Sequence, residues 1–347
     1  MNKLLPLKYT LAFSLYLVSY ISFSLPGYWT YALVIYGYGI IPFLELFYKP
    51  NYNNPETTLQ ESKIYDYLLY AMVPLHFIAL FYFFYAVNQP YLEAYEIVGR
   101  ILTMGTICGH SINIAHELGH RGRKIEQNLA KILLLGSLYM HFIIEHNRGH
   151  HKRAATLEDP ATARKGEILY IFLCRSIFYS YLSAWQLECK RLKERNKNIF
   201  SLENEMVQFE IIQLIFCILI FYFFGLITLL YFFGVSLMGI VLLESINYVE
   251  HYGLLRKKDE NGKYEKITHM HSWNSNVTLG RIMLFELSRH SDHHLVASKK
   301  YQTLKSHDGA PEHPSGYIGM ILLSFFPPAW FWIVNPLLEK VNRSEKL

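Results

Sequence analysis

Residues 211–243 have the sequence IIQLIFCILIFYFFGLITLLYFFGVSLMGIVLL, which contains no charged side chain. An α-helix rises about 1.5 Å per residue and needs about 20 apolar residues to cross the hydrocarbon core of a bilayer. The stretch is therefore too long for a single crossing. Gly225 lies near its middle and is the expected break between two helices, because glycine weakens a helix interior.

Four more apolar blocks precede this stretch, at residues 9–25, 29–47, 65–87 and 97–115. Each has about the length of one membrane crossing. The first block follows Lys3 and Lys8 but lacks an Ala-x-Ala cleavage site. We therefore expect it to remain a membrane helix rather than to be removed as a signal peptide.

Together with helices at 206–224 and 226–247, these blocks predict an all-α integral membrane protein with six transmembrane helices. Its 52% hydrophobic content agrees with this class. We expect a single domain over residues 1–347, in which the segments 116–205 and 248–347 lie outside the bilayer.

The basic residues indicate the orientation. On one side of the six-helix arrangement lie Lys3, Lys8, Lys49, Lys63 and the basic segment 152–197. The turns expected on the other side, at 26–28, 87–91 and 225, contain neither lysine nor arginine. Because lysine and arginine concentrate on the cytoplasmic side, both termini and both long segments are predicted to face the cytoplasm. The basic side would meet anionic membrane lipid or an acidic partner protein, and nucleic acid is not an expected partner.

Nine of the 16 histidines fall into four short groups in the segments predicted to be cytoplasmic. They are His116 and His120; His146, His150 and His151; His251; and His290, His293 and His294. Three groups contain a pair four residues apart, and such a pair shares one face of a helix. A neutral imidazole is a good ligand for iron, copper or zinc. Since one ion takes three or four such ligands, nine histidines indicate two metal ions.

The other seven histidines are predicted not to be ligands: His76, His110, His141, His269, His271, His307 and His313. Some alternatives remain for the nine. The segment from His116 to His120 matches the zinc protease pattern H-E-x-x-H, in which Glu117 would be a general base, although a protease has no use for the other clustered imidazoles. The isolated His251 alone would also fit an ordinary buried histidine.

Carboxylates accompany the histidines. They are Glu117, Glu145, Asp159, Glu250 and Asp292. Two divalent ions bound only by neutral imidazoles need nearby anions, and carboxylates that accept hydrogen bonds from ligand imidazoles also fix their tautomers. We expect this role for all five, with helix capping or solvation as the alternative.

Four motifs resemble those of the membrane-bound non-haem di-iron alkane monooxygenases. They are HELGHR at 116–121, EHNRGHH at 145–151, NYVEHYG at 247–253 and RHSDHH at 289–294. Further similarity runs through 54–56, 158–161 and 271–276, so the resemblance covers nearly the whole chain. Two departures are visible: His269-Met270-His271 stands where the family has adjacent histidines, and Glu286-Leu287-Ser288 replaces the family's usual residues before the last motif.

The resemblance implies two non-haem iron ions held by the nine histidines in a cytoplasmic site. It implies terminal hydroxylation of alkanes to 1-alkanols with O2, by hydrogen abstraction and hydroxyl rebound at the di-iron centre. It also implies a location in the inner (cytoplasmic) membrane of a bacterium. A fatty-acyl desaturase or another di-iron hydroxylase is the nearest alternative, and a zinc metalloprotease or a metal transporter is a more distant one.

The electron donor implied by the resemblance is a rubredoxin-type protein fed by its reductase. Cys108, Cys174, Cys189 and Cys217 form no C-x-x-C pair that would hold a redox centre in this chain. Basic residues near the ligands are candidates for docking the donor: Arg121, Arg123, Lys124, Arg148, Lys152 and Arg153.

The substrate path is predicted to lie among the membrane helices, because an apolar alkane dissolves in the bilayer. Gly37 and Gly39 in the second apolar block mark either close helix packing or a space kept open for the alkane.

Overall fold

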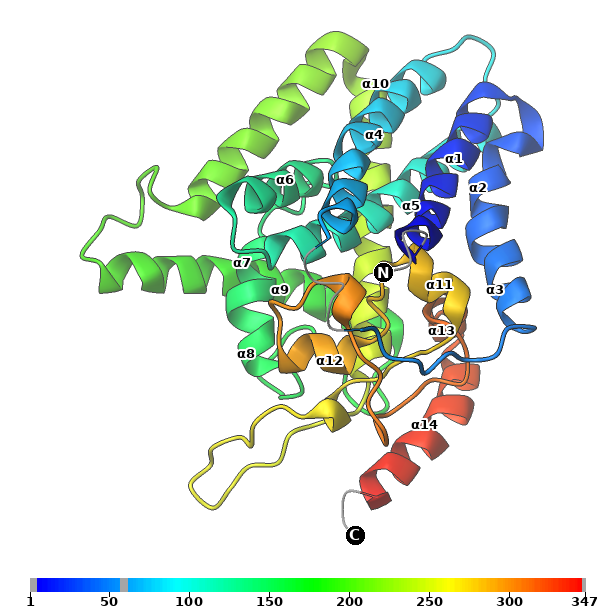
Figure 1. The fold of residues 1–347 in the computed structure, drawn as a ribbon. Helices are drawn as coiled ribbons and strands as arrows, with labels where there is room; N and C mark the ends of the chain where they lie inside the picture. Colours follow the sequence, from blue (N-terminus) through cyan, green and yellow to red (C-terminus); the bar gives the residue numbers. More distant parts are fainter. Residues whose placement is uncertain (1–4, 57–61, 345–347) are drawn as a thin grey trace. The chain divides into compact units, whose positions relative to one another are not determined.

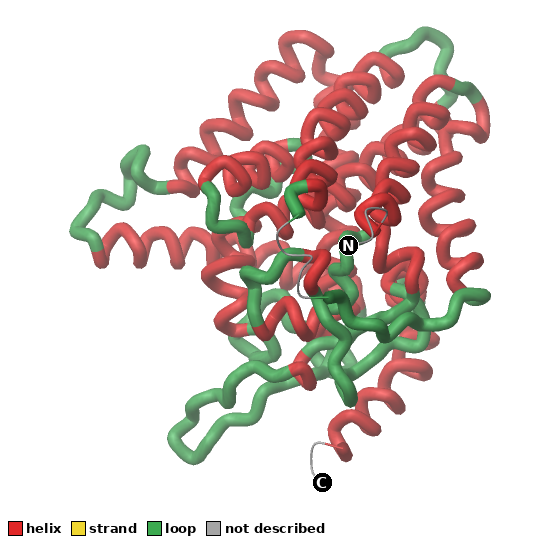
Figure 2. The backbone as a smooth tube through the Cα atoms, viewed as in Figure 1, coloured by secondary structure: helices red, strands yellow, loops and turns green. Residues whose placement is uncertain are grey.

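The computed structural model describes residues 5–56 and 62–344. Within these ranges the chain forms helices and loops and contains no β-strand, which confirms the all-α class (Figure 2). The helices are α1 (Ser14–Ser24), α2 (Ala32–Ile35), α3 (Ile41–Glu45), α4 (Ile64–Val87), α5 (Ala94–Gly119), α6 (Lys124–Leu135), α7 (Phe142–Ile144), α8 (His151–Arg153), α9 (Leu169–Glu194), α10 (Glu205–His251), α11 (Thr278–Met283), α12 (His290–Leu295), α13 (Tyr317–Ser324) and α14 (Pro327–Ser344) (Figure 1).

The chain divides into two compact units that interleave along the sequence. The first unit consists of Met1–Gly39, Lys63–Asn147 and Tyr181–Leu243, and the second unit consists of Ile40–Ser62, Arg148–Ser180 and Glu244–Leu347. Helices α9 and α10 contribute residues to both units. The single domain expected over residues 1–347 stays a prediction.

Helical segments occupy all six stretches that were expected to cross the membrane. Two helices, α4 and α10, are long and apolar enough to do so. Helix α10 is interrupted at Gly225, where φ is +84° and ψ is 171°, a conformation that residues with a side chain rarely adopt. The break predicted at this glycine is therefore confirmed, whereas six crossings stay a prediction.

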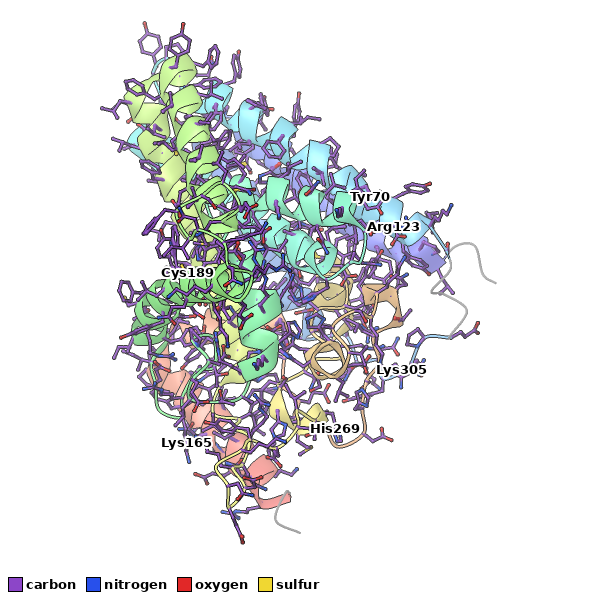
Figure 3. The ribbon with its side chains drawn as sticks, turned by 90° about the vertical axis from the view of Figure 1, so that its left-hand side faces the viewer. Tyr70, Arg123, Lys165, Cys189, His269 and Lys305 are labelled. Carbon is purple, nitrogen blue, oxygen red and sulfur yellow. The ribbon has the colours of Figure 1, made fainter. Side chains whose placement is uncertain are left out.

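The part of α10 in the first unit exposes many large apolar side chains, among them Leu214, Tyr222 and Phe223. Figure 3 shows side chains projecting outward along this part of the helix. A large apolar surface of this kind is unusual on a soluble monomer and suits contact with lipid or another protein.

Helices α5 and α10 approach closely within the first unit because small residues lie at their contact. A Cβ atom on Gly105 would lie 2.5 Å from Met238, and one on Gly109 would lie 3.0 Å from Leu242. From the opposite helix, a Cβ atom on Gly239 would lie 2.7 Å from Cys108. Small residues spaced along a helix allow such backbone contact between apolar helices. This contact fixes α5, whose last turn carries His116.

An aromatic core in the second unit surrounds the C-terminal end of α10. The ring centroids of Tyr248 and Tyr252 lie 5.1 and 5.4 Å from that of Trp330. The indole of Trp273 donates a hydrogen bond to the carbonyl of Tyr252 at 2.8 Å. All four aromatic side chains are almost completely buried. They fix the helix end that carries His251.

Candidate metal centre

Four histidines converge in the second unit. His251 ends α10, His290 and His294 lie one turn apart on α12, and His150 ends the π-helical segment Glu145–His150. The Nε2 atoms of His150 and His294 are 3.2 Å apart, those of His290 and His251 are 3.1 Å apart, and those of His294 and His290 are 2.9 Å apart. We call these residues the four-histidine cluster; all four are buried.

The spacing of these nitrogen atoms fits one metal ion. Metal–imidazole bonds of about 2.0–2.1 Å place two ligand nitrogens about 2.9 Å apart at a right angle and about 3.4 Å apart at a tetrahedral angle. Burial lowers the pKa of His251 to about 3 and that of His294 well below its usual value. The imidazoles of His251 and His294 are therefore neutral at physiological pH, which is the form that binds a metal.

A carboxylate accompanies His150. Its Nδ1 atom donates a hydrogen bond to Asp159 Oδ2 at 3.0 Å, and the hydroxyl of Thr162 donates to the same oxygen at 2.6 Å. Burial opposes the charge on Asp159, but His150 and Thr162 outweigh it and hold the pKa of this carboxyl below its usual value. The bond assigns the proton of His150 to Nδ1, so Nε2 keeps its lone pair for a metal.

A second carboxylate lies beside His290. Glu250 Oε1 is 3.2 Å from His290 Nδ1, and both side chains are buried. Burial raises the pKa of Glu250 well above its usual value. A cation in the four-histidine cluster would favour the ionised form of this carboxyl.

Asp292 has a different surrounding from the one expected from the sequence. Its Oδ1 atom accepts hydrogen bonds from Lys299 Nζ and His307 Nε2, both at 2.7 Å, and its Oδ2 atom accepts one from the amide of Lys305 at 3.0 Å. Burial opposes its charge, but these donors hold the pKa of Asp292 below its usual value. Asp292 thus ties the segment after α12 to the helix, and the sequence pattern missed its partner His307.

The turn before α12 is strained. Phe285 and Glu286 adopt φ values of 51° and 60°, which are unfavourable for residues with a side chain. Glu286 Oε2 lies 2.9 Å from Arg281 Nε, and the ring of Phe285 packs edge-on against Tyr301. These contacts hold the strained turn, which begins at Phe285, five residues before His290, and includes Glu286 from one of the two departures from the family motifs.

Three further histidines gather in the first unit. The ring centroids of His116 and His120, in the last turn and at the end of α5, are 4.9 Å apart. His146 follows α7, and its ring lies 4.4 Å from that of His116 and 5.0 Å from that of His120. The ring of Phe142 stacks on His146 at 4.9 Å. The two remaining members, His151 and His293, lie in the second unit with their Nε2 atoms 3.1 Å apart.

Glu117 and Arg121 form a buried ion pair in the first unit. Glu117 Oε1 accepts a hydrogen bond from Arg121 Nη2 at 2.5 Å, and Asp66 lies 3.4 Å from the same guanidinium. This pairing argues against Glu117 as a free general base of a protease. Arg121 was expected to help dock the electron donor. Because it is buried and paired with Glu117, it cannot be part of an exposed docking surface. Glu145 is likewise buried.

The other basic residues that were candidates for docking the electron donor differ in how exposed they are. Arg123, Lys124 and Lys152 are exposed, whereas Arg148 and Arg153 are half-buried. Arg123 is labelled in Figure 3.

Several histidines outside the nine have structural partners. His313 Nε2 donates to the carbonyl of Val249 at 2.9 Å, and its ring stacks on Trp273. His76 Nδ1 and the hydroxyl of Ser111 are 2.7 Å apart. Such contacts explain buried histidines without a metal.

The two glycines of the expected substrate path also differ. Gly37 is buried, and a Cβ atom placed on it would meet no described atom within 4 Å. Gly39 is exposed, and its Cβ atom would only just reach Ile35. The structure therefore shows free space beside Gly37 rather than a tight helix contact.

The chain is similar to known proteins over most of its length. The model of the fatty acid desaturase family matches residues 94–318, which contain all four histidine groups. Alkane 1-monooxygenase 1 of Pseudomonas aeruginosa is 38% identical over 329 residues, covering 92% of this chain and 86% of that protein. Alkane 1-monooxygenase 1 of Alcanivorax borkumensis is 38% identical over 321 residues, covering 91% of this chain and 78% of that protein. The hydroxylase component of xylene/toluene monooxygenase from Pseudomonas putida is 26% identical over 247 residues, covering 70% of this chain and 64% of that protein.

Proposed function

Because this chain belongs to the alkane 1-monooxygenases within the fatty acid desaturase family, we propose that it hydroxylates the terminal carbon of alkanes to give 1-alkanols. One atom of O2 enters the product, the other leaves as water, and two electrons come from outside the chain. The observation that carries the proposal is the four-histidine cluster, whose nitrogen spacing suits a metal ion.

The nine histidines of the four groups are proposed to hold two non-haem iron ions. The four-histidine cluster would take one ion, and nine imidazoles exceed what a single ion binds, which supports a second ion. When bound, the two ions would supply the activation of O2 and the hydroxylation of the substrate by hydrogen abstraction and rebound.

The residues around the cluster have two tasks. Asp159 holds the tautomer of His150 through the bond at 3.0 Å, and Glu250 is placed to do the same for His290. Burial of the cluster keeps bulk water away, which favours reaction with a bound alkane over side reactions. Neither task requires a nucleophile or a general base from the chain.

The apolar substrate would reach the site from the bilayer. We propose six membrane crossings with the histidines on the cytoplasmic side of the inner membrane of a bacterium, a topology supported by the basic residues and the apolar surface of α10. The free space beside Gly37 supports an alkane path along the second apolar block.

A rubredoxin-type protein with its reductase is the proposed electron source. The exposed Arg123, Lys124 and Lys152, with the half-buried Arg148 and Arg153, would steer an acidic donor towards the cytoplasmic side.

Product analysis in a reconstituted system tests this function. The full chain in lipid nanodiscs, loaded with iron, receives a rubredoxin, its reductase, NADH and a series of alkanes, and the products are identified by mass spectrometry. We expect 1-alkanols carrying one atom from labelled O2. Alkenes among the products would instead indicate a desaturase. Bound zinc together with peptide cleavage would indicate a metalloprotease, and metal flux into vesicles would indicate a transporter.

A further inference from the structure

The end of α12 changes abruptly from buried to exposed. His290, Ser291, Asp292, His293 and His294 are all buried. The next two residues, Leu295 and Val296, expose 37% and 45% of their surface. Two apolar side chains are thus presented to solvent directly after a helix that carries three of the proposed ligands.

A stacked pair of histidines flanks this helix. The rings of His269 and His307 lie 5.7 Å apart at an angle of 18°. The carbonyl of His269 accepts a hydrogen bond from Ser291 Oγ at 2.8 Å, and His307 Nε2 donates to Asp292 Oδ1 at 2.7 Å. The side chain of His307 is 29% exposed, whereas that of Asp292 is completely buried. The hydrogen bond from His307 therefore connects a partly exposed ring to the residue that precedes His293, and Lys299, whose side chain is 26% exposed, donates to the same carboxylate.

The surrounding segment is basic. Residues 295–308 contain Lys299, Lys300 and Lys305 against one acidic residue, Asp308. The ammonium of Lys299 neutralises the buried Asp292. Figure 3 labels His269 and Lys305, both of which belong to the second unit.

We propose that a surface formed by Leu295, Val296, His269, His307 and Lys305, here called the α12 surface, binds a small acidic one-electron iron–sulfur protein. Electrons would then pass to the metal centre through His307, Asp292 and His293. The inference rests on the proposed function and names the docking surface of its donor. Each reduced carrier gives up one electron, so two encounters supply two electrons. These electrons, two protons, one O2 and one alkane together yield one alcohol and one water.

The features of the α12 surface favour a redox partner over other occupants. A small apolar centre with a basic rim suits a brief encounter with an acidic protein, because interfaces of electron carriers are small. Charge complementarity speeds the encounter and fixes its orientation. A lipid surface or a second copy of the chain would not require the hydrogen-bonded connection from His307 to the ligand helix.

Binding is tested with the full iron-loaded chain in nanodiscs of zwitterionic lipid and a purified acidic rubredoxin as the probe. Lys305→Glu and Val296→Asp should each weaken the Kd about tenfold, and Lys305→Glu should also reduce its salt dependence. Matched controls are Lys165→Glu and Leu157→Asp, which change exposed residues of the same unit. Normal affinity in both α12-surface variants, or equal weakening in the controls, would overturn the docking surface.

The electron route is tested by two replacements of His307. Phenylalanine keeps a ring beside His269 but cannot donate to Asp292, whereas glutamine keeps a donor. With reduced rubredoxin at a concentration that saturates each variant in a stopped-flow experiment, His307→Phe should lose most of the fast reoxidation of the donor. His307→Gln should recover most of it. A normal rate in His307→Phe, or an equally slow rate in His307→Gln with iron retained in both variants, would exclude the route.

One further measurement separates this inference from the proposed function. The wild-type chain is given alkane, O2 and a chemical reductant in place of the protein donor. Absence of alcohol there would refute the proposed function itself. Formation of alcohol, together with normal donor binding by the α12-surface variants, would refute only the docking inference.

Discussion

His290 and His294, one turn apart on α12, bring their Nε2 atoms to 2.9 Å from each other. His294 is also 3.2 Å from His150, so its nitrogen faces two other imidazole nitrogens at once. Since burial keeps His294 neutral, it has one ring proton to share at most. A shared cation would satisfy all of these lone pairs together, so we expect His294 to be the most sensitive position of the four-histidine cluster.

Replacing His294 by alanine should therefore remove iron and abolish turnover, because one nitrogen donor of the cluster is lost. Iron is measured by plasma mass spectrometry on protein that still elutes as a folded species. The control is His313→Gln, which changes another buried histidine and keeps a donor for the carbonyl of Val249. Full iron content in His294→Ala would contradict its assignment as a ligand.

Asp159→Asn should weaken iron binding about 10- to 100-fold, the usual cost of removing a carboxylate that orients a ligand imidazole. The amide no longer stabilises the Nδ1–H of His150 with a full negative charge. Competition with a chromophoric chelator gives the affinity. Glu158→Gln is the neighbouring control, because Glu158 is exposed and pairs with Lys258 and Tyr264. Equal affinities for the two variants would remove Asp159 from the site.

Gly37→Trp should shift turnover towards shorter alkanes with unchanged iron content, since the indole would fill free space in the path. Gly39→Trp, at an exposed position nearby, should leave the chain-length profile unchanged. Gly109→Leu is the packing control, because its side chain would meet Leu242, and it should lower the melting temperature. A uniform fall of Gly37→Trp activity over all alkanes, with a lower melting temperature, would favour packing instead.

Gly225→Ala should destabilise the protein by about 1–3 kcal/mol, because a residue with a Cβ atom is strained at this φ and ψ. Thermal unfolding in detergent measures the effect. Gly234→Ala, in a regular part of the same helix, is the matched control. Equal melting temperatures for the two variants would show that the conformation at position 225 does not require glycine.

The sequence was informative wherever a pattern is local. An uncharged run of this length with one central glycine indicates two helices and their break, because both depend on neighbours along the chain. Histidines four residues apart predict a shared helix face for the same reason, and His290 with His294 shows it directly. Within each unit, the structure brings together the histidines that the spacing singled out.

The sequence was uninformative wherever a charge chooses among distant partners. Asp292 was expected beside an imidazole ligand but binds Lys299 and His307, and Arg121 was expected at the surface but is buried against Glu117. Nothing in residue spacing distinguishes these outcomes, since each depends on where a later segment folds. The left-handed turn at Phe285 and Glu286 was also missed, because neither residue is typical of that conformation.

The glycine contact between α5 and α10 has a consequence for how a hydrocarbon leaves the lipid. Carbon atoms in contact are about 3.5–4.0 Å apart, so an alkyl chain cannot pass between backbones that approach as closely as those at Gly109 and Gly239. This seam is closed to substrate. The proposed entry of the alkane from the bilayer would therefore lie between other helices, and a photoreactive alkane should label side chains elsewhere while leaving Met238 and Leu242 unmarked.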